Sequence, residues 1–191
     1  MKSVAAVVLA LVACNDSSSM SVDAPPPTDA AVDGSACSGA CRTTRLTATF
    51  GSVQRSLDRA YYGITKTATG STLHVEVYKG GGTGCPTMGS PTPQYTLVLA
   101  RVPIPSDTTA VTSPGTLLDF VGDLLNGAIN ATATAVTLTP VANDVCPTCV
   151  GMAPPSDADG FIAFDATLTF SGGTITGHVF ATHCDELDEQ Q

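Results

Sequence analysis

Apolar side chains recur at every second residue between Phe161 and Phe170, and no other feature of the chain constrains its fold as strongly. The apolar positions are Ile162, Phe164, Ala166, Leu168 and Phe170, and they alternate with Ala163, Asp165, Thr167 and Thr169. Successive side chains of a strand point to opposite faces, so a period of two brings the apolar residues together. We therefore predict a strand with one buried face.

Two glycines, Gly172-Gly173, follow this segment and are typical of a two-residue hairpin loop that needs positive φ. If they form the loop, Phe170 faces Ile175 and Phe164 faces Ala181, and that face pairs only apolar residues or glycine. The sequence thus predicts an antiparallel hairpin in this register.

Further strands are indicated by β-branched residues and alternation in Thr44 to Phe50, Thr72 to Lys79, Tyr95 to Val102 and Ala133 to Val141. In the second of these segments, Leu73, Val75 and Val77 are expected to point inward, and His74, Glu76 and Tyr78 outward. The fold class that follows is all-β, an antiparallel sandwich-like domain with at most one or two short helices.

One segment has a helical pattern. From Leu117 to Ile129 the apolar residues fall on one helical face, which predicts a short helix, with Gly122 as its weak point. A strand through Leu118 and Phe120 is the competing interpretation. The stretch from Val53 to Tyr61 is a second candidate for a helical turn.

The N-terminus reads as an export signal. Met1-Lys2 precedes an apolar run from Val4 to Ala13 that is too short to span a bilayer. Leu11-Val12-Ala13-Cys14 resembles the lipobox of bacterial lipoproteins. That resemblance implies that residues 1–13 are removed as a signal peptide and that Cys14 carries lipid, a stable anchor when two or more acyl chains are attached. Asn15, in place of the Asp that retains lipoproteins in the inner membrane, favours the outer membrane.

Residues 14–36 have the composition of a spacer. They are rich in Ser, Asp and Pro and contain few large apolar residues, so they bury too little surface to offset the entropy of ordering. We expect a disordered acidic linker that holds a single β-rich domain, residues 37–191, away from the membrane.

Six cysteines remain once Cys14 is assigned to lipid. An even number in an exported chain predicts up to three disulfides, with fifteen possible pairings. A zinc site at the two close cysteine pairs is the less favoured alternative. The six are Cys37, Cys41, Cys85, Cys146, Cys149 and Cys184.

A formal net charge of -9 argues against nucleic-acid binding, which requires a basic surface. Most of the basic residues nevertheless cluster in one stretch, where two tyrosines accompany them. An acidic ligand or the anionic surface of the envelope could bind such a patch, and an ordinary solvated face would account for it equally well. These candidate binding residues are Arg42, Arg45, Arg55, Arg59, Tyr61 and Tyr62.

Catalytic and metal-binding patterns are weak. Cys146-Pro147-Thr148-Cys149 resembles the CPxC motif of glutaredoxin-type proteins, but the following residues are not a helix start, so a structural disulfide is favoured. Asp165 and His178 could pair across the hairpin. Asp157 and Asp159 resemble part of a calcium loop without its anchoring ligands, so neither a metal nor a cofactor is expected.

The C-terminal third is similar to uncharacterised β-rich envelope lipoproteins that end in a GTITG-type strand and a cysteine, here Gly173 to Gly177 and Cys184. The expected function is a non-enzymatic envelope module that binds a glycan or protein partner or stabilises the surface. The alternative is an enzyme, either a thiol-disulfide exchanger at Cys146 and Cys149 or a hydrolase that uses Asp165 and His178.

Overall fold

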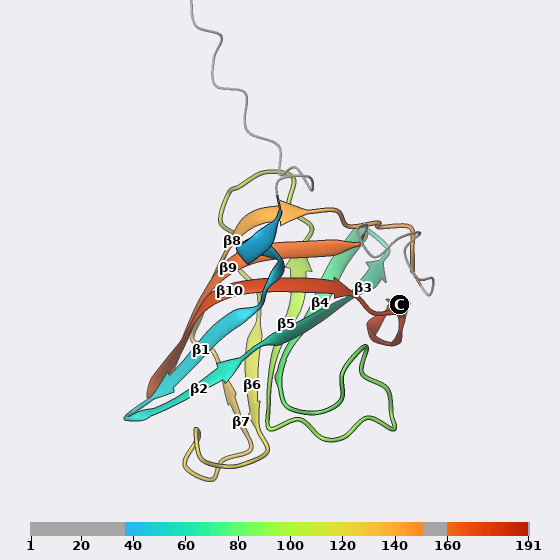
Figure 1. The fold of residues 1–191 in the computed structure, drawn as a ribbon. Helices are drawn as coiled ribbons and strands as arrows, with labels where there is room; N and C mark the ends of the chain where they lie inside the picture. Colours follow the sequence, from blue (N-terminus) through green and yellow to red (C-terminus); the bar gives the residue numbers. More distant parts are fainter. Residues whose placement is uncertain (1–36, 151–159, 191) are drawn as a thin grey trace, which may run out of the picture.

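A computed structural model describes residues 37–150 and 160–190, and nearly all of its regular structure is strand (Figure 1). The all-β prediction is confirmed. The predictions at Cys14, Asp157 and Asp159 lie outside the described residues. The elements are η2 Gly39–Arg42, β1 Arg45–Phe50, β2 Val53–Leu57, β3 Arg59–Thr67, β4 Gly70–Lys79, β5 Tyr95–Pro103, β6 Gly115–Asp119, β7 Asn130–Thr132, β8 Ala135–Asn143, β9 Phe161–Phe170, β10 Gly173–His183, η3 Asp185–Leu187 and β11 Glu189–Gln190.

The strands form one sheet in the order β2-β1-β10-β3-β4-β5-β6-β7, and β8 and β9 continue it from the other side of β10. Most pairs are antiparallel, but β10 and β11 run parallel to β3. β10 is central because β9 borders one side of it, while β1 and then β3 border the other.

The sheet curls around its apolar face, and two bulges contribute to the bend. Ala100 and Arg101 place one extra residue in β5 opposite β4, and Val141 does the same in β8 opposite β9. A bridge between Val111 and Leu138 then links the segment before β6 to β8. The inner face holds the core, whose largest fully buried side chains are Tyr62, Phe164, Leu46, Leu57, Ile64, Leu73, Leu97, Leu99, Leu117, Leu138, Ile162 and Leu168.

The four predicted strands correspond to β1, β4, β5 and β8. In β4, Leu73, Val75 and Val77 are fully buried in the core, while His74 and Glu76 lie on the outer face and are partly exposed. The inward and outward assignment is therefore confirmed for these five residues. Tyr78, also predicted to point outward, lines the cavity on the outer face but is buried, with 6% of its surface exposed.

The C-terminal hairpin has the predicted faces but a register that differs by two residues. Ile175 pairs with Leu168, not with Phe170, because the loop consists of Ser171 and Gly172. A shift of two residues preserves the face of every side chain, so the apolar pattern alone does not distinguish the two registers.

The sequence pattern places Gly173 in the loop, but the residue is the first of β10. Its place in the strand has a packing reason: a Cβ at this position would overlap the ring of Phe50 in the neighbouring β1. Gly172 supplies the positive φ of the turn, +93°.

The predicted helix from Leu117 to Ile129 is wrong, and the competing strand is correct for its first part, β6. A tight loop follows, in which buried Asp119 accepts hydrogen bonds from the backbone N–H groups of four residues, at 2.6 to 3.1 Å. Positive φ at Gly122 and Asn126 is incompatible with a continuous helix. The donors are Val121, Gly122, Leu124 and Leu125.

The stretch from Val53 to Tyr61 is also not helical, since it forms β2 and the start of β3. Its apolar residues are separated by polar ones that pair with β1, so cross-strand hydrogen bonds override the local pattern.

All six cysteines of the described chain are paired: Cys37–Cys41, Cys85–Cys184 and Cys146–Cys149. The disulfide prediction is confirmed, and these sulfurs are therefore not thiolate ligands for zinc. The first and third bridges close short local loops, whereas the second joins positions 99 residues apart. Among the described residues, no helix is long and apolar enough to cross a membrane.

Candidate functional site

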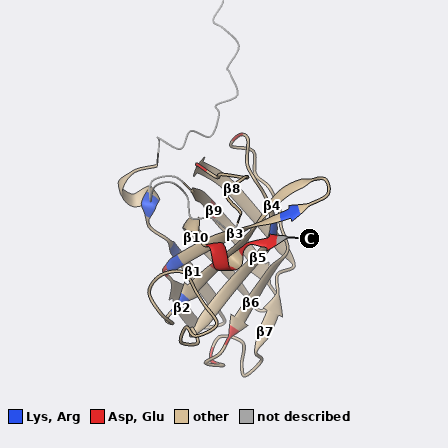
Figure 2. Ribbon diagram, turned by 90° about the vertical axis from the view of Figure 1, so that its right-hand side faces the viewer, with Lys and Arg blue, Asp and Glu red and all other residues tan. Residues whose placement is uncertain are grey.

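The predicted basic residues lie on four different elements, η2, β1, β2 and β3, and Figure 2 shows Lys and Arg in blue on separate parts of the ribbon. Of these residues, Arg42 and Arg59 border a common cavity, which Asp58 also lines. Arg42 lies over the rings of Phe161 and Phe180, with its guanidinium carbon 5.7 and 5.3 Å from the ring centroids. Arg45 donates a hydrogen bond to the carbonyl of Ala40. Both side chains thus help to hold the N-terminal segment against the sheet.

Arg55 lies at the open end of the curled sheet and forms an ion pair with Asp123. Tyr95 donates a hydrogen bond to the same carboxylate at 2.7 Å. Hydrogen bonds from Tyr95 and Arg55 lower the pKa of the Asp123 carboxyl. This arrangement fixes the loop between β6 and β7 to β2, so the charge of Arg55 is already compensated.

The pair Asp165 and His178 forms across β9 and β10, with His178 Nδ1 2.8 Å from Asp165 Oδ1. The second ring nitrogen, Nε2, lies 2.8 Å from the carbonyl oxygen of Cys41. A carbonyl only accepts hydrogen bonds, so Nε2 must donate and is not available to take a proton from a nucleophile. The geometry resembles a structural contact more than a catalytic pair.

Cys146 and Cys149 close a turn in which the N–H of Cys149 donates to the carbonyl of Cys146. Residues 146–150 form a turn and not the first turn of a helix, which is the setting that activates redox thiols. Among the described residues, no cluster of three potential metal ligands is present either.

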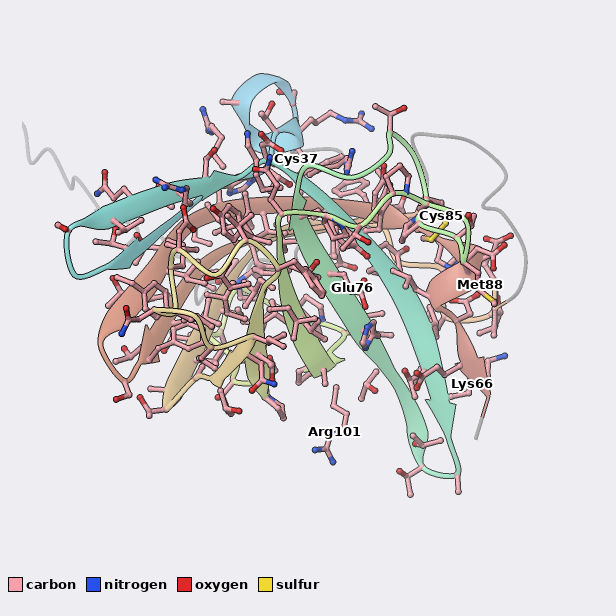
Figure 3. All side chains as sticks on the ribbon, turned by 90° about the horizontal axis from the view of Figure 1, so that it is seen from below. Cys37, Lys66, Glu76, Cys85, Met88 and Arg101 are labelled. Atoms are coloured by element: carbon pink, nitrogen blue, oxygen red, sulfur yellow. A yellow bond between two sulfur atoms is a disulfide. The ribbon has the colours of Figure 1, made fainter. Side chains whose placement is uncertain are left out.

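A cavity of about 420 Å³ lies on the outer face of the sheet, beneath the loop that joins β4 to β5. Its floor is formed by side chains of β3, β4 and β5, namely Arg59, Tyr61, Glu76, Tyr78 and Thr96. Register explains this grouping, since Arg59 pairs with Tyr78 and Tyr61 with Glu76 across β3 and β4. In Figure 3, Glu76 projects from the sheet, and Cys85 and Met88 mark the loop.

Glu76 is the one carboxylate among the described residues that line this cavity, and its side chain is 20% exposed. His74 Nε2 lies 2.8 Å from its Oε1, and the Tyr78 hydroxyl donates to its Oε2. Burial raises the pKa of Glu76, but the hydrogen bonds from His74 and Tyr78 outweigh this effect and lower it below the ordinary value. Glu76 is therefore ionised at neutral pH.

The two partners of Glu76 respond to its charge. The hydrogen bond to Glu76 raises the pKa of His74 despite the burial of the ring. Burial, together with the hydrogen bond to Glu76, raises the pKa of Tyr78. Tyr78 therefore stays protonated, and its hydroxyl group donates a hydrogen bond to the Glu76 carboxylate.

Arg59 connects the floor of the cavity to its roof. Its two terminal nitrogens donate to the carbonyls of Gly80 and Gly82, and its guanidinium carbon lies 5.8 Å from the centroid of the Tyr78 ring. Tyr62, the next tyrosine after the cavity residue Tyr61, points into the core and is 1% exposed. Of the six predicted binding residues, this cavity thus brings together Arg59 and Tyr61, and a smaller cavity of about 230 Å³ brings the same two residues together with Arg42.

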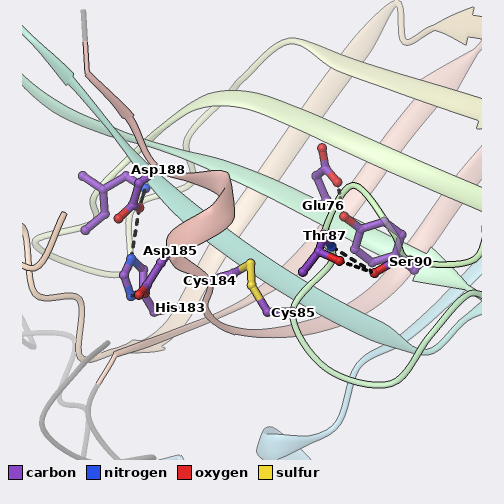
Figure 4. Close-up of a disulfide and its surroundings, with 10 residues drawn as sticks. Glu76, Cys85, Thr87, Ser90, His183, Cys184, Asp185 and Asp188 are labelled. Atoms are coloured by element: carbon purple, nitrogen blue, oxygen red, sulfur yellow. Dashed lines mark hydrogen bonds and ion pairs between the residues drawn. A yellow bond between two sulfur atoms is a disulfide. The ribbon is translucent and has the colours of Figure 1, made fainter. Parts of the chain in front are cut away.

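The roof is fixed by two further links. The Cys85–Cys184 disulfide joins it to the C-terminal segment, and a hydrogen bond of 2.9 Å from the Thr87 N–H to Ser90 Oγ closes a turn within it. Figure 4 shows Glu76 together with this turn and this disulfide. These links hold the loop in place over the floor of the cavity.

Phe120 stands at the rim and is 48% exposed. Its N–H donates to the carbonyl of Gln94 at the end of the roof, and the Asp119 carboxylate holds the loop that follows. Sequence reasoning placed Glu76 on the outer face but assigned it no role, and it interpreted Phe120 as part of a helix. An ionisable residue alternating with tyrosine in a strand is the signal that could have drawn attention to Glu76.

Comparison with known proteins found no matching family profile, no similar curated protein and no similar solved structure.

Proposed function

We propose that this protein is a lipid-anchored, non-enzymatic binding module of the bacterial envelope and that the roofed cavity around Glu76 is its ligand site. The anchor is the lipid expected on Cys14, and residues 15–36 are the acidic spacer between the membrane and the β-rich domain. Outer-membrane attachment follows from Asn15 and is part of the same proposal.

The observation that carries the proposal is an ionised, mostly buried carboxylate inside a cavity that also holds two tyrosine rings. Burying a charge is unfavourable, so a carboxylate in such a place needs compensating partners. Cavities of about 300 to 1,000 Å³ with apolar walls and a few convergent polar groups are the usual form of a small-molecule site. The cavity has this size and composition.

Binding is favoured over catalysis by the chemistry of the groups. Each oxygen of Glu76 already accepts one hydrogen bond, and it is the one carboxylate among the described lining residues, whereas glycoside hydrolysis uses two. His178 has both ring nitrogens engaged. The group best suited to contact a ligand is therefore the ionised Glu76 carboxylate, which can accept further hydrogen bonds.

The four tyrosines of the chain offer a direct test. Two of them, Tyr61 and Tyr78, line the cavity, while Tyr62 and Tyr95 lie outside it and serve as internal controls. We would label the tyrosine rings of the mature lipidated protein in micelles with carbon-13. The ligands would be soluble peptidoglycan fragments, neutral sugars, amino acids and alkylamines.

We expect at least one of these classes to shift the Tyr61 and Tyr78 signals selectively and to be recovered unchanged after incubation. Chemical conversion of a bound compound would replace the binding function with an enzymatic one. If no class shifts these two signals, the cavity is not a ligand site.

A further inference from the structure

The charged groups of the cavity restrict what it can hold, beginning with anions. Arg59 is the one cation among the described lining residues. Both of its terminal nitrogens are bonded to roof carbonyls, and its guanidinium lies against the ring of Tyr78. Of the guanidinium N–H groups that remain, the one on Nε is buried and has no partner, and a carboxylate, phosphate or sulfate that reached them would meet the negative charge of Glu76 within the same cavity.

Cations are not favoured either. Glu76 is compensated by His74, at 2.8 Å, and by the Tyr78 hydroxyl. An ammonium group entering the cavity would also share it with the fixed positive charge of Arg59. Without excess negative charge, the electrostatic gain does not offset the loss of hydration of an ammonium ion.

The remaining lining groups suit a neutral molecule that is apolar on one side and rich in hydroxyls on the other. Tyr61, Leu118 and the exposed Phe120 supply apolar surface, and Glu76 supplies a strong acceptor. Hydroxyl groups that can donate or accept come from Thr87, Ser90, Thr92 and Thr96. A pyranose ring has this division, because its C–H face packs on aromatic rings and its hydroxyls form hydrogen bonds.

We infer that the cavity binds a neutral saccharide unit, with its C–H face on Phe120 and Tyr61 and one of its hydroxyls donating to Glu76. This inference rests on the proposed binding function of the same cavity.

The test titrates the mature lipidated protein with glucose, galactose, mannose and N-acetylglucosamine, and follows the tyrosine ring signals. Glucuronic acid and glucosamine are the charged counterparts, and tyramine and acetate are the non-sugar probes. Chitotriose, compared with free N-acetylglucosamine, distinguishes a polymeric glycan from a free sugar, because a polymer site binds the longer chain more tightly. At least one neutral sugar should shift the signals of Tyr61 and Tyr78 and leave those of Tyr62 and Tyr95 unchanged.

Two variants identify the contacts. Phe120→Ala and Glu76→Gln should each weaken the binding of that sugar roughly tenfold or more. Val121→Ala, next to Phe120 and also exposed but outside the cavity lining, should bind as the parent protein does. Equal affinity of Phe120→Ala and Val121→Ala would overturn the stacking arrangement, and signals of Tyr62 and Tyr95 in the free variants that match the parent's establish that the variants are folded.

The outcomes separate the inference from the proposed function. If a charged or non-sugar probe shifts Tyr61 and Tyr78 and no neutral sugar does so at tens of millimolar, the cavity is a ligand site but not for a saccharide. If nothing shifts these signals, both the inference and the proposed function fail.

Discussion

Gly63 in β3 lies so close to Leu187 in the C-terminal segment that a Cβ at position 63 would overlap the Leu187 carbonyl oxygen. The segment is held there by Asp188, whose Oδ1 accepts a hydrogen bond from the Ile64 N–H at 2.7 Å and lies 3.0 Å from His183 Nε2. Because the roof disulfide ends at Cys184, this contact also supports the cavity.

Gly63→Ala should therefore destabilise the protein by about 1 to 3 kcal/mol, the usual effect of overpacking. Amide hydrogen exchange should rise in residues 184–190. Gly89→Ala is the matched control, because a Cβ there meets nothing within 4 Å. Equal stability of the two variants in urea unfolding would contradict the close contact.

Asp119→Asn should destabilise the loop between β6 and β7. An amide has one acceptor oxygen and turns its NH₂ group toward two of the four backbone N–H groups that the carboxylate now satisfies. We expect a loss of about 2 to 4 kcal/mol and faster exchange at residues 121–125. Asp107→Asn, where an exposed carboxylate accepts one N–H from Thr109, should change stability little.

Replacing both Cys85 and Cys184 by Ser should reduce stability more than replacing Cys37 and Cys41. The Cys85–Cys184 bridge joins residues 99 positions apart and the Cys37–Cys41 bridge only 4, so the former restricts the unfolded chain far more. Chain-entropy arithmetic places the difference at about 2 to 3 kcal/mol. Urea unfolding of the two double variants measures it, and equal losses would show that the local bridge has another role.

The His74–Glu76 pair predicts a pH window for stability. The pKa of His74 is raised above its ordinary 6.5, so its contribution is complete below 6.5 and is lost as the pH rises through the folded value. The pKa of Glu76 is lowered below its ordinary 4.5, so its contribution is complete above 4.5 and is lost as the pH falls through the folded value.

The advantage of the parent protein over His74→Gln should therefore be greatest between pH 4.5 and 6.5. It should shrink as the pH rises through the raised folded pKa of His74 and as the pH falls through the lowered folded pKa of Glu76. Unfolding measured across this range gives the profile, and a constant difference would mean that the charge of His74 does not contribute.

Cys14→Ser should remove the lipid anchor and shift the protein from the membrane to soluble or uncleaved pools. Two or more acyl chains hold a protein stably on a bilayer, so their loss has a large effect on partitioning. Detergent phase separation of the parent and variant proteins measures it. Cys37→Ser is the control for loss of a cysteine that is not an anchor, and unchanged partitioning of Cys14→Ser would contradict lipidation.

The sequence by itself determined which segments of the hairpin and of β4 are strands and which of their side chains face the core. That information is local, because a period of two can be recognised within one short segment, as at the alternate positions Leu73, Val75 and Val77. The outward position of Glu76 and the oxidation of the six cysteines followed from the same kind of reading. Composition and compartment favour disulfides whichever pairs form.

Only the tertiary structure decided the hairpin register, the strand at β6, the partner of each cysteine and the cavity. The loop position depended on whether Gly173 was needed for a turn or for close contact with Phe50, a residue more than a hundred positions away. The apolar segment after β6 forms a loop because the Asp119 carboxylate accepts hydrogen bonds from the backbone N–H groups of that segment. Glu76, its roof and Phe120 meet only when distant segments are paired in the sheet, and such contacts leave no periodic trace in the sequence.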